Sequence, residues 1–170
     1  MHTEKSISKS TILYHKEEET MEAKPMTSEE FSIFLEKSII NYAEEKAHSG
    51  NWTEEESFER AKADYARLLP QDEKTENNHL YSLFQDHILI GSFWLAVMPN
   101  KTGYIYNVEI VKEFRGQGFG KSAMKEIEIK AKELDLTKIE LHVFAHNTTA
   151  RRLYEKIGYE VTNVIMAKSI

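Results

Sequence analysis

The sequence contains no cysteine. A disulfide framework, a thiolate metal site and a covalent cysteine intermediate are therefore all excluded, and any group transfer must use another nucleophile or proceed directly. Residues 1–20 lack the apolar core of a secretory signal, and no later stretch approaches the ~20 consecutive apolar residues that a membrane span requires. We therefore expect a soluble cytoplasmic protein that does not enter a membrane.

Positive charge is also in short supply, because 22 Lys and Arg face 28 Asp and Glu, for a net charge of -6. A general nucleic-acid binder needs a basic face, so this balance argues against nucleic acid and favours cationic small molecules. With 170 residues and 41% hydrophobic content, the chain suits one domain. We assign that domain to residues 25–170 and expect the polar segment 1–24, which has no sustained period, to be a disordered tail or an edge strand.

Two capping boxes predict a pair of amphipathic helices at the start of the domain. Thr27 with Glu30 opens the first, over residues 27–47, and Met26 with Phe31 forms the matching hydrophobic staple. Its apolar face comprises Phe34, Leu35, Ile39, Tyr42 and Ala43.

The second helix starts at the box of Thr53 and Glu56 and stops at Pro70, which lacks an amide donor. Its expected apolar face comprises Phe58, Ala61, Tyr65, Leu68 and Leu69.

From residue 80 the pattern changes to short runs of β-branched and aromatic residues, which predict strands at 80–84, 88–98 and 104–111. Their short connections imply an antiparallel meander. A helix marked by apolar residues between 123 and 134 and a strand at 138–144 then predict a right-handed parallel crossover.

A last helix capped by Asn147 and ended by Gly158 precedes a closing strand at 159–166. Together with the earlier elements it predicts an α/β fold with a mixed sheet.

A glycine-rich loop lies between a predicted strand and a predicted helix, where unpaired helix-start amides and the positive end of the helix dipole meet. Such a place attracts phosphate oxygens. Its sequence is Arg115-Gly116-Gln117-Gly118-Phe119-Gly120. The three glycines remove side chains that would keep a diphosphate away, and Arg115 and Lys121 add charge at the rim. A tight turn without a ligand is the alternative reading.

Two familiar phosphate loops fail on spacing. A Walker A motif needs a glycine five positions before Gly120, where Arg115 stands. A dinucleotide fingerprint needs two residues between its last glycines, whereas only Phe119 separates Gly118 from Gly120.

The loop instead resembles the Arg/Gln-x-x-Gly-x-Gly/Ala motif of the GNAT superfamily of N-acetyltransferases. A second segment, residues 147–159, is similar to that family's Asn-x-x-Ala-x-x-Leu-Tyr-x-x-x-Gly-Phe pattern, with Tyr159 in the last position. Two matches in the right order make the resemblance specific. It covers roughly residues 80–166 and is nearest to bacterial acetyltransferases of unassigned acceptor.

The resemblance implies a single-domain GNAT-type fold with a mixed, mostly antiparallel central sheet flanked by helices. It implies acetyl-CoA as cosubstrate, no metal, and direct transfer to a primary amine of a small molecule or peptide. The initial helix pair occupies the place of the family's variable acceptor-binding helices. A homodimer is compatible with this reading.

Two alternatives differ in function. One is a non-catalytic acyl-CoA-binding regulatory module that meets a partner through Phe31, Tyr42, Trp52 and Tyr65. The other keeps catalysis but uses a protein N-terminus as acceptor or a longer acyl donor.

The resemblance also implies roles for individual residues. Tyr154 corresponds to the general acid that protonates the leaving thiolate, and an unperturbed phenol with a pKa near ~10 holds its proton at neutral pH. The main chain of Val108, Glu109 and Ile110 corresponds to the strand that pairs with pantetheine. The remaining coenzyme contacts are implied for Arg115, Gly116, Gln117, Gly118, Phe119, Gly120, Lys121, Asn147 and Tyr154. Asn147 can serve equally as a helix N-cap.

Two residues are candidates for the general base, with water-mediated deprotonation as the third possibility. Glu109 lies at the end of one strand, and His142 lies on the next strand, where its unperturbed pKa of about 6.5 suits a base. His142 and His146 are four residues apart, a spacing that suits a metal pair on a helix. Because this segment is expected to be strand and loop, we predict no metal site.

Overall fold

The computed structural model describes residues 21–168 and 170, so the prediction for residues 1–20 lies outside the described part. Five strands form one sheet in sequence order. They are β1 (Glu22–Pro25), β2 (Asn78–Gln85), β3 (Ile88–Met98), β4 (Thr102–Ile110) and β5 (Lys138–Leu141). β1 is the edge strand, pairing with β2 between Glu22↔Phe84 and Pro25↔Tyr81.

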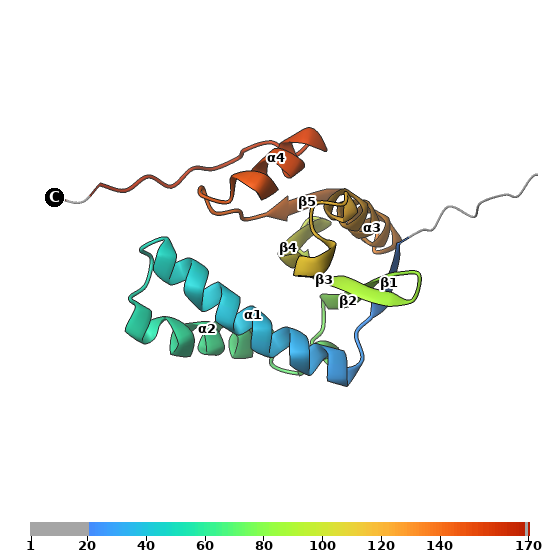
Figure 1. Cartoon of the computed structure of the whole chain (residues 1–170), viewed down its shortest axis with the longest axis horizontal. Coiled ribbons are helices and arrows are strands. Elements are labelled where there is room, and N and C mark those ends of the chain that lie inside the picture. The colour runs from blue at the N-terminus through green and yellow to red at the C-terminus, as the bar shows by residue number, and fades with distance from the viewer. Residues whose placement is uncertain (1–20, 169) are drawn as a thin grey trace, which may run out of the picture.

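Helices cover both faces of the sheet (Figure 1). On one face lie α1 (Ser28–His48) and α2 (Glu54–Leu68), and on the other lie α3 (Phe119–Glu133) and α4 (Thr148–Lys156). Short 3₁₀ turns at Asp72–Lys74 and Lys112–Phe114 complete the described elements. The predicted α/β architecture with a mixed, mostly antiparallel sheet is confirmed, because β1 to β4 pair antiparallel and only β4 with β5 pairs parallel. None of the helices in the described part is long and apolar enough to cross a membrane.

Each face of the sheet has its own apolar core. Beneath α3 the core joins Ala123, Met124 and Ile127 to Phe93 and Leu95 on β3. Beneath α1 and α2 a second core is built around Trp94, which is 1% exposed and whose indole Nε1 donates to Asn78 Oδ1 at 2.8 Å. Consecutive residues of β3 therefore feed opposite cores, as the two-residue period of a strand requires.

Both predicted capping boxes are present. Thr27 Oγ1 accepts from the Glu30 amide while Glu30 Oε2 accepts from the Thr27 amide, at 3.2 and 2.7 Å. Thr53 and Glu56 make the same reciprocal pair at the start of α2. Met26 and Phe31, the predicted staple, are both buried in the same core. Each box satisfies two amides that a helix start would otherwise leave unpaired, which is why both helices begin where the sequence predicts.

The predicted burial of Phe58 and the predicted closing strand at 159–166 are wrong. Phe58 is 47% exposed and the smaller Ser57 is buried, whereas Ala61, Tyr65 and Leu69 of the predicted face are buried as expected. Residues 159–168 form no helix or strand, and Val164 and Ile165 on this segment are 73% and 93% exposed. A strand-like composition yields a strand only where a neighbouring edge pairs with it, and in Figure 1 this segment leads away from the sheet.

The end of α4 explains the Gly-Tyr pair that closes the second motif. The Tyr159 amide donates to the Tyr154 carbonyl at 2.9 Å and the Gly158 amide to the Glu155 carbonyl at 3.2 Å, with Gly158 at φ 100°. This pair of bonds is a Schellman motif, and its hydrophobic contact is the Tyr154–Tyr159 ring pair at 5.7 Å. Gly158 therefore fixes the position of the Tyr154 ring.

We predict that Gly158→Ala lowers stability by about 1–2 kcal/mol, because a Cβ is disfavoured at positive φ although open space surrounds it. Chemical denaturation measures the free energy of unfolding of this variant. Lys156→Ala, at the last residue of α4, is the control. An unchanged unfolding midpoint in Gly158→Ala would show that the left-handed turn does not hold the end of α4.

Candidate functional site

The parallel pair β4–β5 separates after its first four residues. β5 pairs with Thr102 to Ile105, whereas β3 pairs with β4 along its whole length. Tyr106 is an extra residue in β4, because Trp94 lies opposite Asn107 and Leu95 opposite Ile105. A bulge of this kind bends a strand and increases its twist. One main-chain edge of residues 106–110 is thus left without a strand partner in the described chain.

Asn107 stands directly after the bulge and carries an unsatisfied polar atom. Its Oδ1 is buried and has no hydrogen-bond partner among the described residues. Burying such a group without a hydrogen-bond partner lowers the free energy of unfolding by about 1–3 kcal/mol. Sequence reasoning did not single out Asn107, although a lone amide between Tyr106 and Val108 in an apolar strand was a visible signal.

The glycine loop leaves main-chain donors free. Gly116 and Gly118 have φ values of 77° and 89°, and a Cβ added to either would meet open space. Within the described chain, no hydrogen bond to a protein acceptor is made by the amides of residues 116–120. Five donors at the start of a 15-residue helix form the kind of concavity that binds anions.

The first turn of α3 differs in charge from the first turns of α1 and α2. Those helices carry Glu29 and Glu30, and Glu54 to Glu56, in their first turns, whereas α3 has no acidic residue there and carries Lys121. The acidic side chains of α1 and α2 offset the positive end of the dipole. At α3 this positive end remains available to an external anion.

Gly120, the third glycine of the loop, allows close packing between α3 and α4. A Cβ at Gly120 would lie 3.2 Å from Leu153 Cδ2, so its absence lets α4 pack against the start of α3. This contact brings Tyr154, the neighbour of Leu153, to the same side of the molecule as the glycine loop. The structure therefore brings the two sequence motifs into contact.

Other predicted loop residues brace the loop itself. Arg115 Nε donates to the Ile110 carbonyl at 2.7 Å and its Nη2 bonds Glu109 Oε1 at 3.0 Å. Gln117 Nε2 donates to the Glu113 carbonyl at 3.1 Å. Phe119 packs against Phe114 with ring centroids 6.3 Å apart. Arg115 thus faces the end of β4 in this structure.

Tyr154 lies half-buried against the α3-side core. Burial raises the pKa of its phenol above the ordinary value of 10.0. Its hydroxyl has no hydrogen-bond partner in the described chain and is not among the fully buried unsatisfied atoms. Asn147 caps the same helix, with Oδ1 accepting from the Ala150 amide at 3.1 Å, as predicted.

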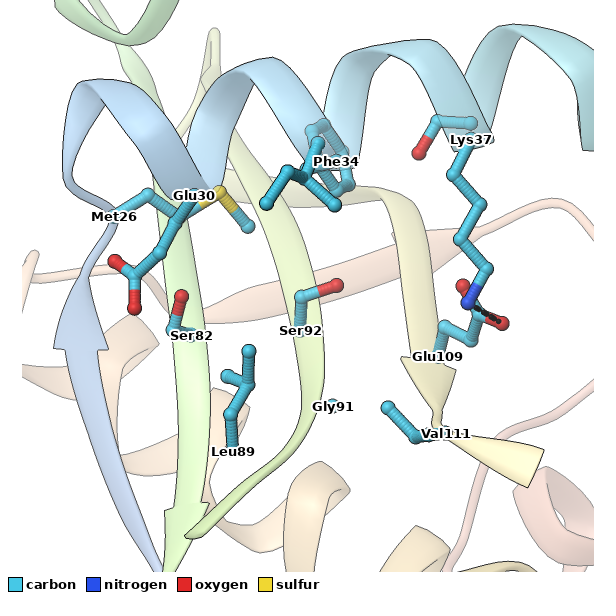
Figure 2. A pocket seen from close by; sticks show the side chains of 12 residues that line it. Met26, Glu30, Phe34, Lys37, Ser82, Leu89, Gly91, Ser92, Glu109 and Val111 are labelled. Atoms are coloured by element: carbon cyan, nitrogen blue, oxygen red, sulfur yellow. Dashed lines mark ion pairs between the residues drawn. The ribbon is translucent and has the colours of Figure 1, made fainter. Parts of the chain in front are cut away.

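On the opposite face of the sheet, a cavity of ≈ 110 Å³ lies between α1 and strands β2 to β4 (Figure 2). One water needs about 15 Å³ by the same measure, so a small organic group fits. The walls are mainly apolar and include Ile33, Phe34, Leu89 and Val111. Side chains of Glu30, Lys37 and Glu109 add charge.

Glu109 lines this cavity and is only 19% exposed, unlike a strand glutamate that faces water. Two cations bind one of its oxygens: Lys37 Nζ lies 2.9 Å and Arg115 Nη2 3.0 Å from Oε1. Val108 and Ile110, its neighbours, pack toward the core on the other face. The alternation along β4 therefore places the Glu109 carboxylate toward α1.

His142 is not on a strand, because β5 ends at Leu141 and the predicted strand is three residues too long. The chain turns away here toward the α4 cap, and His142 is exposed. Burial of part of the ring, with a smaller contribution from Lys46, lowers its pKa below the usual value. His142 packs edge-on against Phe144. The two base candidates consequently lie by different parts of α1, because Glu109 contacts Lys37 and His142 is near Lys46.

The loop after β5 docks onto α1 through His146. Its Nε2 lies 2.7 Å from Glu45 Oε2, and its ring stacks on Phe144. Among the described residues no group of three or more His, Asp or Glu side chains is placed to hold a metal. Of the aromatic residues suggested as a partner surface, Phe31 and Tyr65 are 3% and 6% exposed and belong to the core, so that part of the hypothesis is wrong.

Three features described above are those of a coenzyme A-dependent acyltransferase. They are the free amides at a glycine-lined helix start, the separated strands β4 and β5, and a tyrosine on the helix that packs against the glycine loop. Residues 39–159 match the family model described as Acetyltransferase (GNAT) family. The chain belongs to this family, and the predicted GNAT-type fold and acyltransferase class are confirmed.

Two similar proteins come from Bacillus subtilis (strain 168). The uncharacterized N-acetyltransferase YdgE is 36% identical over 149 residues, covering 85% of this chain and 95% of that protein. The crystal structure of YycN, 35% identical, superposes with a TM-score of 0.86 and covers 89% of this chain and 99% of that chain. PaiA N-acetyltransferase from Thermoplasma acidophilum, solved in complex with coenzyme A, shares the fold at 17% identity, a TM-score of 0.63 and coverage of 86% and 93%. Family members use acetyl-CoA.

We predict that Asn107→Leu preserves or raises the melting temperature, because it removes a buried acceptor without a partner. The same substitution should weaken binding of coenzyme A several-fold, since a ligand in the gap beside β4 would lose that acceptor. Thermal unfolding and calorimetry measure the two effects. A destabilised variant with wild-type affinity would contradict the prediction.

Proposed function

We propose that this protein transfers the acetyl group of acetyl-CoA directly to a primary amine of a small molecule or peptide. The proposal depends on the free main-chain amides of residues 116–120, which follow the end of β4 whose edge has no strand partner. The free amides suit the charged diphosphate of the coenzyme. The strand edge suits the amide groups of its pantetheine arm.

The diphosphate fits the start of α3. The amides of residues 116–120 donate to phosphate oxygens, and Lys121 adds a positive charge at the rim. The pantetheine arm fits the edge of β4 at Val108, Glu109 and Ile110, which pairs with it as an additional strand. Asn107 Oδ1 gains a hydrogen-bond donor from the same arm. When bound, acetyl-CoA supplies an acetyl group activated as a thioester.

Tyr154 is proposed as the proton donor to the departing thiolate. Its hydroxyl has no competing partner in the described chain, and its raised pKa keeps it protonated at neutral pH. The Schellman turn at Gly158 holds its ring against Tyr159, and the preceding residue, Leu153, packs against the glycine loop at Gly120.

Glu109 is proposed as the group that receives the acceptor amine and its proton. It lines the cavity under α1, whereas His142 is exposed beyond β5 and does not line it. The acceptor enters from the α1 side, and the thioester lies along β4, so the reactants meet at this strand. No covalent enzyme intermediate is required, and the chain has no cysteine to form one.

We predict that Gly118→Ala raises the dissociation constant of coenzyme A at least tenfold, because φ 89° disfavours a Cβ and the added methyl enters the anion site. Gly50→Ala is the matched control, since Gly50 has φ 72° and equally open surroundings at the end of α1. Calorimetry measures both variants. Absence of coenzyme uptake by the folded wild-type protein would remove the proposed function altogether.

We predict that Tyr154→Phe lowers kcat by about 10²-fold, the lower range for general acid catalysis, with little change in coenzyme affinity. Because its pKa is raised above 10.0, the phenol stays mostly protonated up to pH 10. At saturating amine, kcat should therefore not decrease as the pH rises to that value. Thiol-release assays across pH 6–10.5 provide both measurements. Wild-type turnover in the phenylalanine variant would exclude Tyr154 as the donor.

A further inference from the structure

At the Glu109 end of the α1 cavity, two cations share one carboxylate. Lys37 and Arg115 both bind Glu109 Oε1, at 2.9 and 3.0 Å, while Oε2 binds no residue of the described chain. Lys37 Nζ reaches down from α1 to this carboxylate (Figure 2). Its side chain is 49% exposed and makes no second ion pair among the described residues, so it is free to exchange partners. One carboxylate thus serves two cations at the place where an amine must bind.

A simple alkylammonium is poorly suited to this arrangement. To reach Glu109 it would join two positive groups around one negative group, and like charges within about 4–6 Å oppose one another. A substrate that carries its own carboxylate next to its ammonium resolves this conflict. Its ammonium binds Glu109, and its carboxylate takes over the ammonium of Lys37, so that each charge keeps an opposite partner.

The remainder of the cavity indicates what such a substrate carries. The apolar walls are formed by Ile33, Phe34, Leu89 and Val111, with Met26 just before the start of α1. The volume of ≈ 110 Å³ admits a small side chain and not a polymer. At the Met26 end, Glu30 is held in the capping box by its 2.7 Å bond to the Thr27 amide. An apolar side chain is therefore favoured over an anionic one.

Given the proposed acetyl transfer, on which this inference rests, we propose that the acceptor is a free α-amino acid with a compact apolar side chain. Its ammonium binds Glu109, its carboxylate binds Lys37, and its side chain fills the cavity beneath α1. Lys37 is then the residue that selects amino acids over simple amines.

The ammonium gives one proton to Glu109, and the neutral nitrogen attacks the thioester carbonyl. The new C–N bond forms as the C–S bond breaks, and nitrogen loses its second proton to solvent. Tyr154 protonates the thiolate, and the proton on Glu109 returns through solvent to Tyr154. The products are the N-acetylamino acid, free coenzyme A and one proton released to solvent.

The test compares each amino acid with the amine that lacks only its carboxylate. The pairs are valine with isobutylamine, leucine with 3-methylbutylamine, methionine with 3-(methylthio)propylamine, and phenylalanine with 2-phenylethylamine. With the full-length protein and acetyl-CoA, we expect at least one amino acid to exceed its paired amine about 10- to 100-fold in kcat/KM, the value of a charge-assisted hydrogen bond.

The variant Lys37→Met should abolish this preference by lowering kcat/KM for the amino acid and not for the amine. Lys62→Met is the control, because Lys62 is an exposed residue of α2 outside the cavity. Arg115 remains in both variants, so the loop stays braced.

Two kinds of result would overturn the inference. One is an equal or higher kcat/KM for every amine than for its amino acid. The other is an equal loss for both members of a pair in Lys37→Met. If coenzyme A binds and amines outside these pairs are acetylated, the proposed function stands and the amino-acid inference is wrong. If coenzyme A does not bind, the failure lies in the proposed function itself.

Discussion

The separation of β5 from β4 is the constraint on which the rest of the site depends. Parallel strands normally satisfy each other's main-chain groups, and here the ladder stops after Ile105 because Tyr106 is an extra residue that bends β4. The consequence is an edge of β4 without a strand partner in the described chain, beside a buried Asn107 oxygen that has no hydrogen-bond partner among the described residues. A fold tolerates such groups where a ligand satisfies them.

The two faces of the sheet carry different groups. On the α3 side, the glycine loop and α4 meet through the Gly120–Leu153 contact, which gathers the anion site and Tyr154. On the α1 side, alternation along β4 turns Glu109 toward the cavity and Lys37. β4 therefore lies between a face suited to the coenzyme and a face suited to the acceptor. Its unpaired edge is where the thioester and the amine can meet.

Sequence reasoning was most reliable where the signal was local. Capping boxes at Thr27 and Thr53 and the cap at Asn147 were confirmed because each depends on residues three positions apart. It was weaker where the result depended on distant packing. Phe58 is exposed although it was expected on the apolar face, and the segment 159–168 found no strand edge. His142 left the sheet because β5 ended at Leu141.

The amino-acid sequence by itself determined the family, the α/β class and the location of the glycine loop, because motifs and caps are set by residue type at short spacing. Only the tertiary structure decided that α4 packs against that loop through Leu153, that Glu109 faces a cavity and that Lys37 and Arg115 share its carboxylate. Lys37 and Glu109 are 72 positions apart in the chain, and Lys37 lies outside the predicted apolar face of its helix. No local pattern encodes such a meeting, because it follows from how α1 crosses the sheet.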